Sequence, residues 1–467
     1  MAHSMRRGGQ EPKGEVKVPG TTITMYSNAQ GSWQRLESHG TTSAYHAEYV
    51  IGSGAHASGY IMDLGDHLFQ SPVAYYSGRS AYGLAPGYEG KPDPDFTRPI
   101  AEACVFCHAG SFDTVKGTQN EYGAIPFPHL AIGCSRCHGS TAEHLSKPGP
   151  QNIVNPARLE PGARDSVCEQ CHLTGVARIL NPGKQFTDFK PGERLEQTFT
   201  IYHNEAPKGR DVAFKVISHS EQLALSQCKR NSGEKMWCGT CHDPHYEPAN
   251  PVEYYRERCL TCHAKTQFAS DHPSKTSNCI GCHMPTKETA DGGHTAFTDH
   301  HIRRRPEPVP VEEPATIAAW REPPVELATR NLGIASVEVG MERQSPKLIV
   351  SGYRMLTEVQ QQFPEDSEMY NTMGNALFVG RQYGEAVQAF ELAVRHDPTS
   401  SPKEVNLAQA YIALGEDAQA QEHLEKAMEL DSLNLNAATL LMQIYDKNGE
   451  QAKSDALAKR LAKFVGR

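Results

Sequence analysis

Residues 367–398 read S-E-M-Y-N-T-M-G-N-A-L-F-V-G-R-Q-Y-G-E-A-V-Q-A-F-E-L-A-V-R-H-D-P, and their pattern returns 34 positions further along the chain. Small and large apolar residues recur in this stretch at helical spacing. In the first copy they are Tyr370, Met373, Gly374, Ala386, Phe390 and Ala393, followed by Pro398. In the second copy the corresponding residues are Leu407, Ala408, Tyr411, Ala420, Leu424 and Ala427. A third, weaker copy starts near Leu435, and an earlier pair of helices is expected over roughly 327–341 and 346–363.

These positions resemble the consensus of the tetratricopeptide repeat. The resemblance implies that residues 327–467 form an α-helical solenoid, with small residues such as Gly374 and Ala408 allowing paired helices to approach closely. Such arrays present a concave surface to a peptide or protein. The alternative interpretation is a cap that stabilises the rest of the chain or makes it dimerise.

The cysteines form a second pattern, because twelve of the 13 fall into C-x-x-C pairs whose second Cys is followed at once by His. The pairs are Cys104 with Cys107, Cys134 with Cys137, Cys168 with Cys171, Cys238 with Cys241, Cys259 with Cys262, and Cys279 with Cys282. This spacing is typical of thioether attachment to c-type haem. Zinc ribbons need no His after every pair, and a disulfide framework predicts no such spacing. We therefore expect six haem c groups in this chain.

The histidines supply candidate iron ligands on both sides of each expected haem. The proximal candidates follow the cysteine pairs directly: His108, His138, His172, His242, His263 and His283. The distal candidates are His129, His144, His245, His272, His294 and His300, with His56 as a further one. More histidines lie between residues 39 and 301 than six irons need, so their number does not decide whether one iron stays open.

Composition sets limits on the 467-residue chain. Apolar residues make up 38% of it, and the net charge of −9 argues against binding nucleic acid. No stretch approaches the 18 consecutive apolar residues of a transmembrane segment. Residues 1–100 favour β-branched and aromatic residues between glycine-rich turns, which predicts short β-hairpins that cover the haem domain. The expected organisation continues with a six-haem domain over 101–302, a Pro-rich linker over 303–326 and the repeat domain over 327–467.

As a whole, the chain resembles multihaem c-type cytochromes that carry C-terminal tetratricopeptide repeats, and it is loosely similar to the cytochrome c554 and hydroxylamine oxidoreductase lineage. The motifs that carry the resemblance are G-C-S-R-C-H-G (133–139), W-C-G-T-C-H-D-P-H (237–245) and G-G-H-T-A-F-T-D-H-H-I (292–302). The resemblance implies a mainly α protein with a haem-packed domain. It supports His144, His245, His272, His294 and His300 as distal ligands, and His129 less firmly.

The start of the chain departs from this group, whose members open with a signal peptide and a further C-x-x-C-H. We expect Met1 to be an internal Met taken as the start, with export to the periplasm and a seventh haem in the extended form. The expected function is electron transfer through mostly bis-His haems, with a redox partner protein docking on the repeats or at an exposed haem edge. One alternative is an oxidoreductase whose open haem iron acts on a small nitrogen or oxygen compound. Another is a sensor or scaffold in which the haem domain reports the redox state and the repeats relay it.

Overall fold

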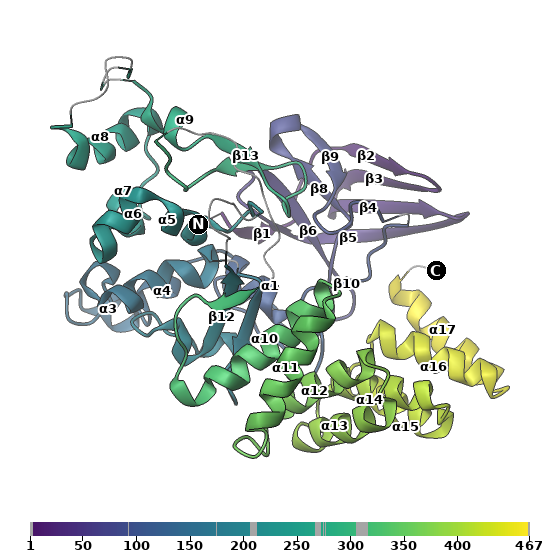
Figure 1. Cartoon of the computed structure of the whole chain (residues 1–467). Coiled ribbons are helices and arrows are strands. Elements are labelled where there is room, and N and C mark those ends of the chain that lie inside the picture. The colour runs from purple at the N-terminus through teal and green to yellow at the C-terminus, as the bar shows by residue number, and fades with distance from the viewer. Residues whose placement is uncertain are drawn as a thin grey trace.

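The computed structural model describes residues 3–91, 93–173, 175–205, 213–266, 272–273, 275, 277–304 and 316–465, with side chains up to residue 462. The chain runs from a β-sheet through a middle segment of short helices to a stack of longer helices, as the colours of Figure 1 show. The β-rich N-terminus and the helical C-terminus predicted from the sequence are confirmed.

The N-terminal sheet is antiparallel, with the strand order β10-β7-β6-β5-β4-β3-β2. Its strands are β1 (Met5–Arg7), β2 (Gly14–Val18), β3 (Thr21–Asn28), β4 (Gly31–Ser38), β5 (Thr41–Ile51), β6 (Ala57–Asp63), β7 (Leu68–Gln70), β8 (Val73–Tyr76), β9 (Ala81–Leu84) and β10 (Arg98–Pro99). β1 pairs with β5, and β8 pairs with β6 and β9. The hairpin β4–β5 turns through His39 and Gly40, whose φ angles of 48° and 81° are the positive values that a two-residue turn of type I′ requires.

Alternation along these strands builds two apolar clusters on the sheet. Ile23 and Met25 of β3 are buried with Tyr45 of β5, and their polar neighbours lie nearer the solvent. Tyr49 and Ile61 pack in another cluster that includes residues of the following helix. The predicted hairpins, whose strands are up to 11 residues long, join in one sheet because each hairpin buries its apolar face with its neighbours.

The middle segment consists of short helices joined by long loops. Its helices are α1 (Glu102–His108), α2 (Ser135–His138), α3 (Ala142–Ser146), α4 (Pro161–His172), α5 (His219–Leu225), α6 (Gln227–Ser232), α7 (Cys238–Cys241), α8 (Pro251–His263) and α9 (Cys279–His283). Two small sheets accompany them, β11 (Ala177–Leu180) with β12 (Phe199–Asn204) and β15 (Ile317–Ala319), and β13 (Thr286–Glu288) with β14 (Ala296–Thr298). Among the described residues from α5 to α9, no apolar side chain is buried, so these helices have no apolar core of their own.

Part of the expected linker is built into the fold. Residues 305–315 lie outside the described residues, but β15 pairs with β12, and the Trp320 amide donates to the Ile201 carbonyl at 2.8 Å. The segment before the repeats therefore completes a sheet where an extended linker was expected.

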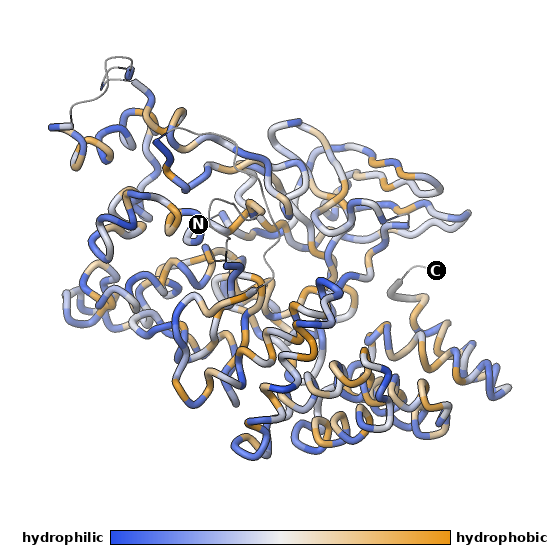
Figure 2. Tube along the Cα trace, in the orientation of Figure 1, coloured by the Kyte–Doolittle hydropathy of each residue, from blue (hydrophilic) through white to orange (hydrophobic). Residues whose placement is uncertain are grey.

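The C-terminal helices form antiparallel pairs. They are α10 (Ala328–Glu342), α11 (Pro346–Val359), α12 (Ser367–Val379), α13 (Tyr383–His396), α14 (Ser401–Leu414), α15 (Asp417–Leu430), α16 (Leu435–Lys447) and α17 (Gln451–Val465). The side chain of Asp366 caps α12 by accepting from the Met369 amide, and Asn434 caps α16 in the same way. Hydrophobic and hydrophilic stretches alternate along these helices in Figure 2, as expected for helices that bury one face.

The three parts of the chain are in contact. In the middle segment, Ile179 of β11 and Tyr202 of β12 share an apolar core with two residues of the repeat domain. These are Ile334 of α10 and Leu356 of α11. The loop around Gly117 reaches the repeat domain, where the Ser401 amide donates to the Gly117 carbonyl at 2.8 Å. Within the described residues, no helix is both long enough and apolar enough to cross a membrane.

Candidate functional site

The first helices of successive repeats, α12, α14 and α16, place a row of carboxamides at equivalent positions. Asn375, Gln409 and Gln443 are one 34-residue repeat apart, and each is half-buried or exposed. The opposite faces of the same helices hold the buried residues Met373, Leu407 and Leu441. Helical periodicity therefore directs the three amides away from the core. We call Asn375, Gln409 and Gln443 the amide row.

Two further features lie on α12 and α14. The Asn406 side-chain amide donates to the Asn371 side-chain carbonyl at 2.9 Å and links α14 to α12. Val379 and Leu414, at the C-terminal ends of the same two helices, are 50% and 42% exposed. The amide row is not among the predicted sites, although a carboxamide recurs every 34 residues in the sequence and this recurrence could have revealed it.

The predicted cysteines lie on the short helices of the middle segment. Within each pair the two thiols are three residues apart along the chain, and in α1, α4, α7, α8 and α9 both belong to one helical turn. All 13 cysteines are free thiols in this structure. The Cys171 thiol hydrogen-bonds to Cys107, and Arg178 Nη1 lies 3.6 Å from the Cys107 sulfur, so both neighbours lower the pKa of Cys107.

The cysteines differ in how far the chain covers them. Cys104, Cys134, Cys262 and Cys282 are exposed, and the other nine cysteines are half-buried. Cys262 and Cys282 lie open because α8 and α9 have no buried apolar side chains around them within the described residues.

Three histidines that follow cysteine pairs face a predicted distal histidine. The ring centroids are 5.8 Å apart for His138 and His245, with an angle of 18° between the ring planes. They are 6.1 Å apart for His242 and His300, at 29°, and 6.1 Å apart for His272 and His283, at 14°. We call these three pairs the stacked His pairs.

His219, which is not among the predicted ligands, lies beside one of these pairs. Its ring centroid is 4.7 Å from that of His300 and 5.2 Å from that of His172. Burial lowers the pKa of His219 to about 3 and that of His300 to about 4, which keeps both imidazoles neutral at pH 7. The buried Nδ1 of His219 has no hydrogen-bond partner among the described residues.

The other predicted ligands have different neighbours. His56 packs on Phe297, with ring centroids 4.2 Å apart, and His294 packs on Tyr76 at 5.1 Å. His144 Nδ1 lies 3.1 Å from the Asn152 side-chain oxygen. His129 is exposed, as are His108 and His263. The structure brings none of these six against a second histidine within the part of the chain that it describes.

The comparisons with known proteins concern the C-terminal helices. Residues 405–432 match the tetratricopeptide repeat family. Anaphase-promoting complex subunit 6 of Arabidopsis thaliana is 33% identical over 91 residues, which are 18% of this chain and 17% of that protein. The chain thus matches less than a fifth of the length of this curated relative. The C-terminal part of the chain is a tetratricopeptide-repeat region.

Two solved structures are among those matched by part of this chain. The crystal structure of MamA shares 19% identity, covering 29% of this chain and 77% of MamA, with a TM-score of 0.27. The first tetratricopeptide domain of Spaghetti, bound to an HSP90 peptide, shares 17% identity, covering 27% of this chain and 99% of that domain, with a TM-score of 0.24.

These findings correct the expected function. The family match identifies a tetratricopeptide repeat, and the curated relative is a complex subunit, where the sequence had suggested an electron-carrying cytochrome or a haem oxidoreductase. The expectations of six haem c groups, a seventh in an extended form and a haem-packed domain are corrected with it, because these two matches fall on a tetratricopeptide repeat and on a subunit of the anaphase-promoting complex and not on a cytochrome. The haem expectation rested only on the spacing of the C-x-x-C-H motifs along the chain.

The matches fall on the C-terminal helices, so they do not bear on several of the expectations. The assignment of the Cys and His residues as ligands, the domain boundaries, the periplasmic location and the redox character of a partner all stay predictions. A partner protein as such agrees with the repeat family.

Proposed function

We propose that this chain is a binding scaffold that holds an extended segment of a partner protein on the amide row. The observation that carries the proposal is the return of a carboxamide at one repeat position in three successive repeats, at Asn375, Gln409 and Gln443. The match of this region to the tetratricopeptide repeat family supports it. The curated relative is, by its name, a subunit of a complex.

The chemistry of the surface fits a peptide backbone. A carboxamide both donates and accepts hydrogen bonds, so a row of them can pair with the N–H and C=O groups of an extended chain. Charged side chains at the edge are already paired, since Lys403 Nζ lies 2.9 Å from Asp397 and 3.5 Å from Glu368. The exposed Val379, four residues after Asn375 on α12, adds an apolar contact for the partner's side chains.

Selection from a phage-displayed peptide library on the whole chain tests this proposal. Peptides that are enriched are then synthesised, and their Kd is measured by fluorescence polarisation. We expect Gln409→Ala combined with Gln443→Ala to weaken binding at least tenfold, which corresponds to about 1.4 kcal/mol. Gln388→Ala, an exposed amide on α13 outside the amide row, is the control and should leave Kd unchanged. No enrichment, or equal loss in the control, would reject the amide row as the binding surface.

A second function is favoured by the stacked His pairs. We propose that each pair holds one metal ion between its two imidazoles. A metal ion bound about 2.1 Å from one nitrogen of each ring places the two ring centroids about 6 Å apart. The observed separations are 5.8, 6.1 and 6.1 Å. Helices α5–α9 also lack a buried apolar residue, and metal–ligand bonds would stabilise such a segment.

Elemental analysis of the purified chain tests the metal proposal. We expect His245→Ala to lower the metal content by about one ion per chain. His423→Ala is the control, because His423 lies in the repeat domain and hydrogen-bonds to Glu404. Metal-free protein, or an equal loss in both variants, would refute the proposal. A porphyrin band in the absorption spectrum of the same sample would mean that the chain holds haem and not separate metal ions.

A further inference from the structure

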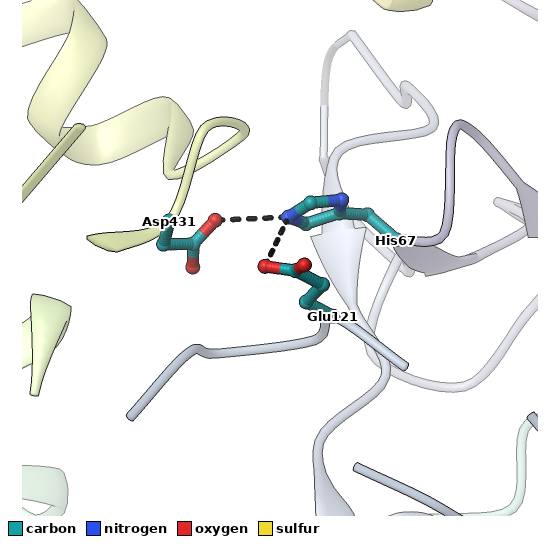
Figure 3. Close-up of side chains that lie close together, drawn as sticks. All are labelled: His67, Glu121 and Asp431. Carbon is teal, nitrogen blue, oxygen red and sulfur yellow. Dashed lines mark hydrogen bonds and ion pairs between the residues drawn. The ribbon is translucent and has the colours of Figure 1, made fainter. Parts of the chain in front are cut away.

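Three ionisable side chains from distant parts of the sequence meet where the N-terminal sheet contacts the repeats. Figure 3 shows His67 just before β7, Glu121 in the loop after α1, and Asp431 between α15 and α16. His67 Nε2 lies 3.0 Å from Asp431 Oδ1 and 3.7 Å from Glu121 Oε2. His67 is 2% exposed and Asp431 is fully buried.

The other ring nitrogen of His67, Nδ1, forms a hydrogen bond with the backbone. His67 Nδ1 lies 3.1 Å from the Gly65 carbonyl, which can only accept, so Nδ1 carries a proton and donates it. This leaves Nε2 directed at two carboxylate oxygens. Two carboxylates around one imidazole nitrogen need a positive charge between them, which is either a second proton or a metal cation. A backbone carbonyl that orients the far nitrogen is the usual arrangement behind a metal-bound imidazole.

The carboxylate of Asp431 is held in place from both sides. Its Oδ2 accepts from the Gln119 amide at 3.1 Å, and its Oδ1 accepts from the Leu433 amide at 3.2 Å. The nearest ligand atoms of His67, Glu121 and Asp431 all lie within 4.8 Å of one another. A tetrahedral metal with bonds of about 2.1 Å separates its ligand atoms by roughly 3.4 Å, between the two distances observed around Nε2.

We propose that His67, Glu121 and Asp431 bind a divalent first-row transition metal that fastens the repeat domain to the N-terminal sheet. One imidazole and two carboxylates suit zinc, iron or manganese, with water at the remaining positions. The Glu121 side chain is 30% exposed and provides the side from which the ion and its water enter. The site is independent of the amide row and of the stacked His pairs, because it shares no residue with either.

Manganese is the probe for the test, because the soft thiols of the middle segment compete weakly for this hard ion. The whole chain is titrated with Mn²⁺, and free Mn²⁺ is followed by electron paramagnetic resonance. We expect one equivalent fewer to bind to His67→Gln than to the unchanged chain, and Zn²⁺ to displace that equivalent. Glu121→Gln should bind it at least tenfold more weakly.

A matched control separates this site from an ordinary pair of charges. His39→Gln removes an exposed histidine of the same sheet that lies 3.5 Å from Asp93, and it should keep full Mn²⁺ binding. The proposal is overturned if the unchanged chain binds no more Mn²⁺ than His67→Gln, since the contact is then an ion pair of protonated His67. If His67→Gln does not fold, Mn²⁺ binding of the unchanged chain is compared with that of Glu121→Gln instead. The Glu121 side chain is partly exposed, so we expect this variant to keep the sheet intact.

Discussion

A buried ion pair of the repeat domain lies where α10 contacts the middle segment. Arg330 donates from Nε to Asp366 Oδ2 at 2.8 Å and from Nη2 to Oδ1 at 3.0 Å. The same guanidinium reaches the Leu180 carbonyl at 2.6 Å, and the neighbouring Asn331 donates to Thr200 and Asn181. Arg330 is 1% exposed, so its charge depends on Asp366 for compensation.

Asp366→Asn is expected to lower the free energy of unfolding by about 3–5 kcal/mol, because it leaves the Arg330 charge buried and unpaired. The substitution keeps an oxygen that can cap α12, which separates the charge from the cap. Urea unfolding followed by circular dichroism measures the loss. The double variant with Arg330→Met should recover much of it, and a loss below about 1 kcal/mol in the single variant would contradict the assignment.

At the start of α4, Glu160 predicts a dependence on pH. The amides of Gly162 and Ala163 donate to its carboxylate at 2.9 and 2.7 Å, and these bonds lower the pKa of Glu160. A lowered pKa means that the contact stabilises the fold above the carboxyl's unfolded-state pKa and is lost as the pH falls through the folded-state value.

Glu160→Ala should therefore cost about 0.5–1 kcal/mol at about pH 6 and less at about pH 2.5, because the contact is lost as Glu160 takes up a proton. Urea unfolding of the two proteins at both pH values measures the difference. An equal cost at both pH values would show that the carboxylate charge plays no part in the cap.

At the scale of elements, the close approach of paired helices sets the geometry of the repeat array. A Cβ atom at Gly374 of α12 would lie 2.5 Å from the Phe390 ring of α13. At Gly352 of α11, a Cβ atom would lie 2.5 Å from the Gly333 carbonyl of α10. The 34-residue pattern predicted that small residues allow this approach, and the helix pairs confirm it.

Gly374→Ala is expected to lower the stability of the repeat domain by about 1–3 kcal/mol, because Phe390 or the backbone must shift. Thermal unfolding of the whole chain measures the change. Gly384→Ala on α13 is the control, since nothing lies within 4 Å of its added Cβ and alanine favours the helix. Equal effects at the two positions would contradict the close packing of α12 on α13.

For the whole molecule, the loop that contains Gly117 fixes how the repeats sit against the remainder of the chain. Gly117 has a φ of 86°, and a Cβ atom there would overlap the Thr399 carbonyl of the turn before α14. The same loop supplies Gln119 and Glu121 to the contact with Asp431. Figure 1 shows the repeat helices running from the middle segment to a position below the N-terminal sheet.

Gly117→Ala is expected to loosen the repeat domain from the sheet and to enlarge the radius of gyration measured by small-angle X-ray scattering. Gly90→Ala is the matched control, because Gly90 has a similar φ of 76° but nothing lies within 4 Å of its added Cβ. Both variants carry the backbone strain of a positive φ, and only the first also meets another part of the chain. The same radius for both variants would mean that this loop does not hold the domains together.

The sequence by itself determined the features that depend on local spacing. The 34-residue pattern predicted the paired helices and the start of α16 at Leu435, and strand-like alternation predicted the β-rich N-terminus. Helical and strand periodicity express which face of one element is buried, and that information is local. The same local spacing placed twelve cysteines in pairs, but it led to a haem and electron-transfer interpretation that the comparisons corrected.

Only the tertiary structure decided which distant residues meet and which side chains stay open to solvent. It placed His67 against Asp431, 364 positions away, and it brought His219 beside His300. It also drew residues 317–319 of the expected linker into a sheet with β12. The physical reason is that these contacts arise when separate elements bury their surfaces together, and no periodicity along one element records the partner that it will find.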